Sequence, residues 1–174
     1  WAAYPIIHLD FGNAKADSAE TLEEYLRLRI QQEADKLGKN LKQNDSAAAF
    51  YELIVALAND EQKVVILIDE YDKPILNNIL SPKIKEILNV LKGFYSTIKT
   101  CDSMERFVFM TGVSKFSKVS VFSDLNNLVD LTMDARFANM MGYTQEELED
   151  NFGAYLRPLA EKQNIDYNDF LAKI

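Results

Sequence analysis

The sequence predicts an α/β fold in which helices cover both faces of a parallel sheet, giving three layers. Two apolar segments, 64–68 and 107–111, have the length and the β-branched or aromatic composition of buried strands. Between them, apolar residues at 84–98 recur at helical spacing, and this helix is long enough to be the crossover that parallel strands require. The order strand, helix, strand therefore favours a parallel sheet.

A third strand is expected at residues 4–11, ending near Gly12. It carries His8, the single histidine of the chain, and the sequence offers no partner for a metal-binding or catalytic role. We therefore expect His8 to pack within the strand. Asp10 falls at the strand end, where side chains of α/β sheets can face a ligand.

Start and stop signals place two helices between the first two strands. A capping-box pattern at Thr21 opens the first helix, and Gly38 closes it. Asp45 or Ser46 caps the second helix. Apolar residues recur at helical spacing along both segments, so these helices are expected to pack on the core.

The chain is expected to divide into an α/β core at residues 1–132 and a helical, lid-like segment at 133–174. A short final strand is expected at 128–131, near the end of the core. A second capping box at Thr144 opens a long helix, which Pro158 is expected to kink or divide. Asp166 then caps the last helix.

Composition bounds the possible functions. The 174 residues are 48% hydrophobic, enough for one packed domain and a small appendage. A net charge of −8 argues against broad binding to nucleic acid or to an anionic membrane through this segment. The sequence has no apolar run near 18 residues, and its single cysteine, Cys101, has no partner for an internal disulfide. These features predict a cytoplasmic protein with an inert thiol.

The most informative segment is the aliphatic run 64–68 together with the two acids that end it, Asp69 and Glu70. Acids at the carboxyl end of a buried parallel strand occupy the edge where α/β sheets bind ligands. One carboxylate in such a position can hold Mg²⁺, and the next can orient or deprotonate a water molecule. The alternative is that both acids merely end the strand and open the next helix.

A second polar cluster, Thr111, Ser114 and Lys115, follows the strand at 107–111. A hydroxyl or an ammonium group in this place can reach a terminal phosphate that lies between neighbouring strands. The alternative is an ordinary turn with Lys115 in solvent. Two polar clusters at the same edge of the sheet favour a phosphate-handling cleft.

These segments together resemble the AAA-ATPase-like family of bacterial and archaeal P-loop NTPases, many of which carry a PD-(D/E)XK nuclease-like domain further on. The run 64–70 resembles a Walker B strand. The resemblance extends over about residues 1–150, and its four segments, at 4–11, 68–74, 111–117 and 122–128, read YPIIHLDF, IDEYDKP, TGVSKFS and FSDLNNL.

The resemblance implies a site for ATP and Mg²⁺ in the intact parent protein. Asp69 would hold the metal through water, and Glu70 would polarise the attacking water. Thr111 or Ser114 would occupy the sensor position beside the γ-phosphate, and Lys115 would reach the phosphate. Arg136 is a candidate lid or finger arginine, with a solvent or ion-pair role as its alternative.

One family feature is absent from these 174 residues: none of the six glycines lies in the phosphate-binding pattern G-x-x-x-x-G-K-[ST]. The resemblance places that loop and its strand upstream of residue 4, with the strand beside 107–111. We therefore expect this chain to bind no nucleotide tightly by itself. We also expect an exposed edge at 107–111, covered by self-association or by a partner.

Three functions remain open. The first is the core of an ATPase whose intact parent binds and hydrolyses ATP. The second is a non-catalytic α/β module for binding or assembly. The third is a metal-dependent nuclease or phosphatase that uses Asp10, Asp69 and Glu70, and it is the weakest because no further carboxylate or histidine cluster completes a metal site.

Overall fold

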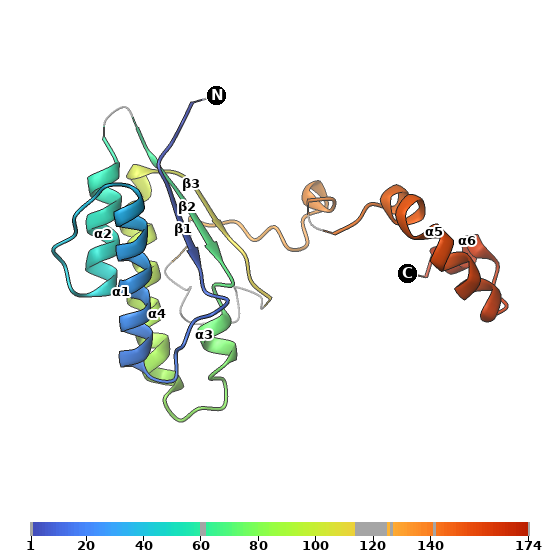
Figure 1. Ribbon diagram of the computed structural model, residues 1–174, viewed down its shortest axis with the longest axis horizontal. Coiled ribbons are helices and arrows are strands. Elements are labelled where there is room, and N and C mark those ends of the chain that lie inside the picture. Colours follow the sequence, from blue (N-terminus) through green and yellow to red (C-terminus); the bar gives the residue numbers. More distant parts are fainter. Residues whose placement is uncertain (1, 60–61, 114–124, 126, 141, 174) are drawn as a thin grey trace. The chain divides into compact units, whose positions relative to one another are not determined.

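The computed structural model describes residues 2–59, 62–113, 125, 127–140 and 142–173. They form two compact units, Trp1–Val129 and Asp130–Ile174. The first unit contains the sheet and the second is helical (Figure 1). No helix in the described part of the chain is both long enough and apolar enough to span a membrane.

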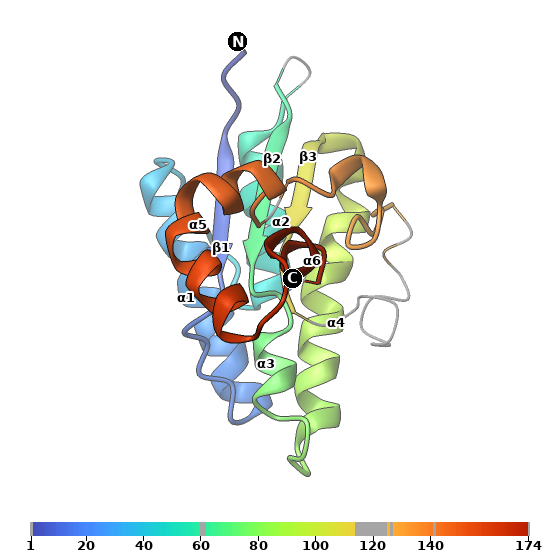
Figure 2. The same cartoon turned by 90° about the vertical axis from the view of Figure 1, so that its right-hand side faces the viewer.

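The first unit is built on a parallel three-stranded sheet with the order β1-β2-β3. Strand β2 (Val64–Asp69) lies between β1 (Ile6–Asp10) and β3 (Glu105–Met110), as Figure 2 shows with the strands side by side. The register pairs Asp10 with Asp69 and Ile68 with Met110. The α/β fold with a parallel sheet is therefore confirmed.

Helices α1 (Ala19–Lys36), α2 (Ser46–Leu57) and α4 (Ile84–Thr100) lie together on one face of the sheet (Figure 1). The short helix α3 (Lys73–Leu76) follows the end of β2. Among the described residues of this unit, no helix covers the other face. The expected third layer is thus wrong for this part of the chain, where the sheet and its helices make two layers.

Burial along the strands reflects this one-sided cover. Side chains on the helix side are buried, including Ile7 and Ile66 at 0% exposure. On the other side, Ile6 and Phe107 are 48% and 54% exposed. The alternation follows from the two-residue period of a strand, since successive side chains point to opposite faces.

Aromatic side chains fill the space between the helices and the sheet. Phe94 of α4 is fully buried and stacks on Phe50 of α2, with ring centroids 4.8 Å apart. It also packs against Phe11 and Tyr95, at 6.2 and 5.7 Å between centroids. One side chain thus joins two helices to the segment that follows β1, so Phe94 lies at the centre of the core.

The two edges of the sheet differ. At β1, the backbone N–H of His8 donates to Glu33 of α1 at 3.2 Å, and Glu33, which is 3% exposed, also pairs with Lys36 at 2.6 Å. This carboxylate accepts one outward backbone N–H of β1. At β3, alternate backbone groups point away from β2 at residues 106, 108 and 110, and no hydrogen bond joins them to another described residue. Strand β3 is therefore the open edge within the described sheet.

Most predicted helix caps are confirmed. Asp45 caps α2, Thr144 caps α5 (Gln145–Lys162) with a capping box, and Asp166 caps α6 (Tyr167–Leu171). The first helix is the exception, because Ser18 is its cap and Thr21 is the third helical residue of that capping box.

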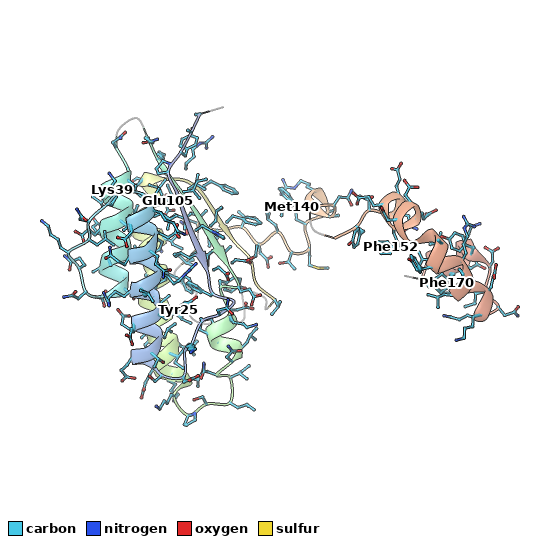
Figure 3. The ribbon with its side chains drawn as sticks, viewed as in Figure 1. Tyr25, Lys39, Glu105, Met140, Phe152 and Phe170 are labelled. Atoms are coloured by element: carbon cyan, nitrogen blue, oxygen red, sulfur yellow. The ribbon has the colours of Figure 1, made fainter. Side chains whose placement is uncertain are left out.

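Residues 128–131 form no strand, so the expected final strand is wrong. Pro158 lies inside α5 and does not divide the helix, and a kink at this proline stays a prediction. In the second unit, Phe170, labelled in Figure 3, belongs to α6. Its side chain is 7% exposed, and the Arg157 guanidinium of α5 lies 4.2 Å from the centre of the Tyr167 ring of α6. These contacts pack α6 against α5.

Replacing Phe94 tests the core. We expect Phe94→Ala to lower the free energy of unfolding by about 3–5 kcal/mol, because it removes a fully buried ring and leaves a cavity. The control is Leu80→Ala, at a side chain that is 95% exposed, for which we expect a change below about 0.5 kcal/mol. Urea denaturation measures both, and equal effects would contradict this description of the core.

Glu105, at the start of β3, makes stability depend on pH. Burial, with a smaller contribution from Asp102, raises the pKa of the Glu105 carboxyl to about 8, and its Oε1 has no hydrogen-bond partner among the described residues. The folded state therefore holds a proton that the unfolded chain releases near pH 4.5. Its stabilising effect is complete below that pH and is lost as the pH rises to about 8.

The variant Glu105→Gln cannot ionise, so its stability should not fall in this way. Because Glu105 is only half-buried, solvent screening reduces the effect, and between pH 5 and 9 we expect wild type to lose about 1–3 kcal/mol relative to this variant. Thermal or urea unfolding across this range measures the difference. Glu24→Gln, at an exposed position of α1, is the control, and its free energy of unfolding should change with pH as that of wild type does. The same pH dependence in Glu105→Gln would contradict the burial of an ionisable carboxyl.

Candidate functional site

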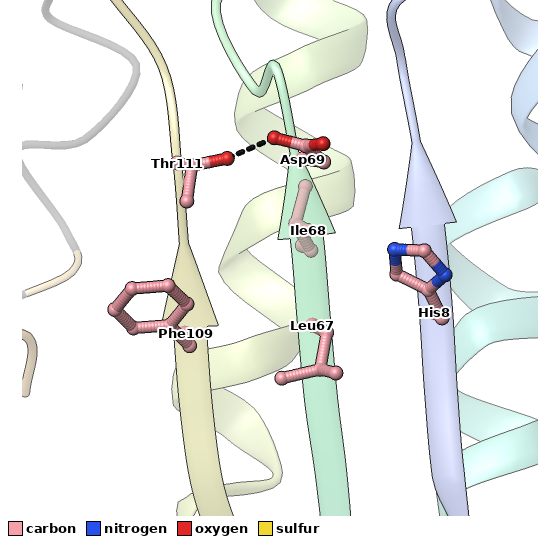
Figure 4. Close-up of a pocket in the computed structure, with 6 residues that line it drawn as sticks. All are labelled: His8, Leu67, Ile68, Asp69, Phe109 and Thr111. Atoms are coloured by element: carbon pink, nitrogen blue, oxygen red, sulfur yellow. Dashed lines mark hydrogen bonds between the residues drawn. The ribbon is translucent and has the colours of Figure 1, made fainter. Parts of the chain in front are cut away.

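The ends of β2 and β3 bring Asp69 and Thr111 into contact. The Thr111 hydroxyl donates a hydrogen bond to Oδ1 of Asp69, as Figure 4 shows. The backbone beneath this contact is fixed, because the Thr111 N–H donates to the Ile68 carbonyl at 2.9 Å. Two side chains that are 42 residues apart in the sequence therefore meet at the carboxyl edge of the sheet.

Glu70 follows Asp69 in an uncommon backbone conformation. Its φ of 51° lies in the left-handed region, which a residue with a side chain adopts at a cost of about 1–2 kcal/mol. Its N–H donates to Oδ1 of Asp69 at 3.0 Å, and its carboxylate lies 3.2 Å from the ammonium of Lys73. Such strain in proteins is concentrated at functional sites.

The loop after β1 forms another side of the site. Asp10 is in register with Asp69, and its Oδ1 accepts the N–H of Gly12 at 2.7 Å. The Tyr25 hydroxyl donates to the Asp10 carbonyl at 2.8 Å. A Cβ at Gly12 would lie 3.0 Å from Oδ1 of Asp10 and 3.8 Å from Cδ of Glu70. The Glu70 side chain therefore lies close to the backbone of this loop.

Gly112 and Asp72 form a contact that the sequence did not reveal. Asp72 is 2% exposed, and its Oδ2 accepts the N–H of Val113 at 3.0 Å. A Cβ at Gly112 would lie 2.6 Å from the Tyr71 ring and 2.7 Å from Oδ1 of Asp72. The segments that follow β2 and β3 thus pass each other at a distance that only glycine permits.

An open hollow lies below these polar groups, on the face of the sheet that the described helices of the first unit leave uncovered. His8, Leu67 and Phe109 line it, and Asp69 and Thr111 lie at its upper end (Figure 4). His8 is exposed here, so the prediction of a packed strand histidine is wrong. The reason is that no described helix of the first unit covers this face, where a helix would have buried the imidazole.

The other predicted site residues lie outside the described part of the first unit. Ser114 and Lys115 lie outside the described residues. Arg136 belongs to the second unit, where its guanidinium lies 2.6 Å from the Asp134 carboxylate. This arginine lowers the pKa of Asp134 through their hydrogen bonds. The ion pair is the role that the sequence left as the alternative for Arg136.

The donors at the edge of the sheet suit a magnesium ion that is shared with phosphates. Mg²⁺ in nucleotide sites keeps several waters and takes one or two carboxylates together with phosphate oxygens. Asp69 is exposed, and Asp10 lies beside it in the register. Within the described ranges, no group of three or more His, Cys, Asp or Glu side chains could hold a metal.

Comparison with known proteins identifies the class. The model of the AAA-ATPase-like family, described as a predicted AAA-ATPase, matches residues 1–122, so the chain belongs to this family. It is also 41% identical over 155 residues to a protein of Azotobacter chroococcum mcd 1, described as an uncharacterized protein in the vnfD 5′ region. The match covers 88% of this chain and 30% of that protein, so the chain spans less than a third of the relative's length. No solved structure matches the chain.

Gly112→Ala tests the close approach after β3. We expect it to destabilise the first unit by about 1–3 kcal/mol, because the new methyl group would overlap the Tyr71 ring and the Asp72 carboxylate. Gly93→Ala is the matched control: a Cβ there meets nothing within 4 Å, and alanine favours the helix by about 0.5–1 kcal/mol. Urea denaturation should give opposite signs, and equal signs would contradict the geometry.

Proposed function

We propose that this chain supplies the metal-binding and water-orienting strand of an AAA-type ATPase core with P-loop NTPase topology. The longer parent polypeptide would bind and hydrolyse ATP with Mg²⁺. The observation that carries the proposal is the hydrogen bond from the Thr111 hydroxyl to Asp69 at the carboxyl edge of β2 and β3. Membership of the AAA-ATPase-like family supports the same reaction class.

Each residue then has a defined task. Bound Mg²⁺ would neutralise charge on the phosphates, with Asp69 holding it directly or through water. Glu70 would accept a hydrogen bond from the attacking water and orient it. Its left-handed backbone and the ion pair with Lys73 hold the side chain at the edge of the sheet. Thr111 would keep the Asp69 carboxylate oriented and sense the terminal phosphate.

The groups that cradle the phosphates are proposed to come from polypeptide outside these 174 residues. The printed sequence contains no glycine-rich loop with the required lysine and hydroxyl residue. Ser114, Lys115 and Arg136 remain proposed phosphate contacts. ATP binding by the 174 residues alone is therefore expected to be weak.

The open edge of β3 supports a second element of the proposal. Glu33 accepts the outward N–H of His8 in β1, whereas the outward backbone groups at 106, 108 and 110 of β3 have no hydrogen bond to another described residue. We propose that a further strand, from the longer polypeptide or from a second copy, pairs there. The same edge, with Phe107 54% exposed, also favours the alternative of a non-catalytic assembly module.

Glu70→Gln in a longer protein with the upstream residues separates these two functions. We expect the variant to bind ATP as wild type does but to hydrolyse it about 10²–10⁴-fold more slowly, because the amide cannot act as a base. Phosphate release and ATP titration measure the two properties, with Glu24→Gln as the control. An unchanged rate, or a longer protein that neither binds nor hydrolyses ATP, would contradict the ATPase proposal.

A further inference from the structure

Asp72 is a buried carboxylate that no proposed step of the reaction uses. It lies between β2 and α3, is 2% exposed, and accepts the N–H of Val113 through Oδ2 at 3.0 Å. Burying a carboxylate carries a large desolvation cost, and packed apolar side chains could join two loops without it. A buried charge at this place therefore calls for an explanation beyond packing.

The contacts around Asp72 join the chain segments that leave β2 and β3. The Tyr71 N–H donates to the Thr111 carbonyl at 3.0 Å, two residues before Val113. The Tyr95 hydroxyl of α4 donates to the Tyr71 carbonyl at 2.8 Å, which ties the first segment to a core helix. Two hydrogen bonds thus hold the backbone of Thr111: its N–H is bonded to Ile68 in β2, and its carbonyl is bonded to Tyr71 just after β2.

Val113 shows how much depends on the carboxylate. Its side chain is 85% exposed, so packing does little to hold the chain there. Its N–H donates to the Asp72 carboxylate, and hydrogen bonds to charged acceptors are roughly twice as strong as those between neutral groups. Gly112 allows the approach, because any Cβ there would overlap Asp72 and Tyr71.

We propose that Asp72 is a positioning residue: by anchoring the N–H of Val113 it fixes the chain after β3 and keeps the Thr111 hydroxyl on Asp69. Asp72 acts through Thr111 and touches neither substrate nor metal. Its role rests on the proposed function of the Asp69–Thr111 pair. The geometric claim itself needs no nucleotide, so it can be tested separately.

Amide hydrogen exchange and threonine-methyl NMR on the 174-residue chain provide the test. In Asp72→Ala we expect the Val113 amide to exchange at least about tenfold faster, relative to the Ile66 amide in the centre of β2, because its acceptor is gone. In Asp72→Asn an oxygen acceptor remains without its charge, so we expect an increase of about threefold. The Thr111 methyl signal should move in the same order, while those of Thr97 and Thr100 in α4 stay in place.

Asp45→Ala is the matched control, since it removes another aspartate acceptor, the one that caps α2 at 2.9 Å from the Ala48 nitrogen. It should change the exchange of Val113 and Ile66 by the same factor and leave the Thr111 signal in place. The proposal would be overturned if the Asp72 variants accelerated exchange of the Val113 and Ile66 amides by the same factor. It would also be overturned if the Thr111 methyl signal did not move. If Asp72→Ala fails to fold, Asp72→Asn alone decides by the same two readouts.

The two proposals fail in different ways. A graded response to the Asp72 variants in a chain whose longer parent hydrolyses no ATP would leave the positioning role in place and remove the ATPase. ATP hydrolysis by the parent without a graded response to the Asp72 variants would support the ATPase and remove the positioning role.

Discussion

The central place of β2 in the parallel sheet is the constraint on which the site depends. Bonded to β1 on one side and to β3 on the other, β2 fixes the register that brings Asp10, Asp69 and Thr111 to one edge. The ladder continues past the strands, because the Phe11 N–H donates to the Asp69 carbonyl at 2.9 Å. The polar side chains therefore stand on backbone that is already held in place by the sheet.

The strained turn at Glu70 has a structural consequence at this edge. With φ at 51°, the N–H of Glu70 donates to the Asp69 side chain, and the N–H of Tyr71 reaches Thr111 instead. The left-handed conformation of Glu70 thus directs its own N–H to the Asp69 carboxylate. It also lets the next residue join the segments that follow β2 and β3. The cost of that conformation is offset by these hydrogen bonds, and the strain lies beside the acid proposed to orient water.

Local patterns in the sequence were sufficient to predict the three strands of the sheet and the caps at Thr144 and Asp166. They left Asp45 and Ser46 as alternative caps of α2, and they also predicted a strand at 128–131 that does not form. Each correct prediction depends on residues within one element, so periodicity and capping rules reach it. Contacts between distant segments were not predicted. An aspartate two residues beyond Glu70 looks like any other polar loop residue, and its burial against Val113 depends on a strand about 40 residues later. The third layer was predicted because apolar parallel strands usually have two covered faces, and within the first unit the described helices cover one.

The most direct test of the proposed ATP site is the binding of a non-hydrolysable ATP analogue with Mg²⁺, monitored by NMR of the backbone amides. It would compare the 174-residue chain with a longer protein that includes the upstream residues. We expect saturable binding by the longer protein and none by the 174-residue chain, with the largest shifts at Asp69, Glu70 and Thr111. Saturable binding whose shifts leave these three residues unchanged, or no binding by the longer protein, would contradict it.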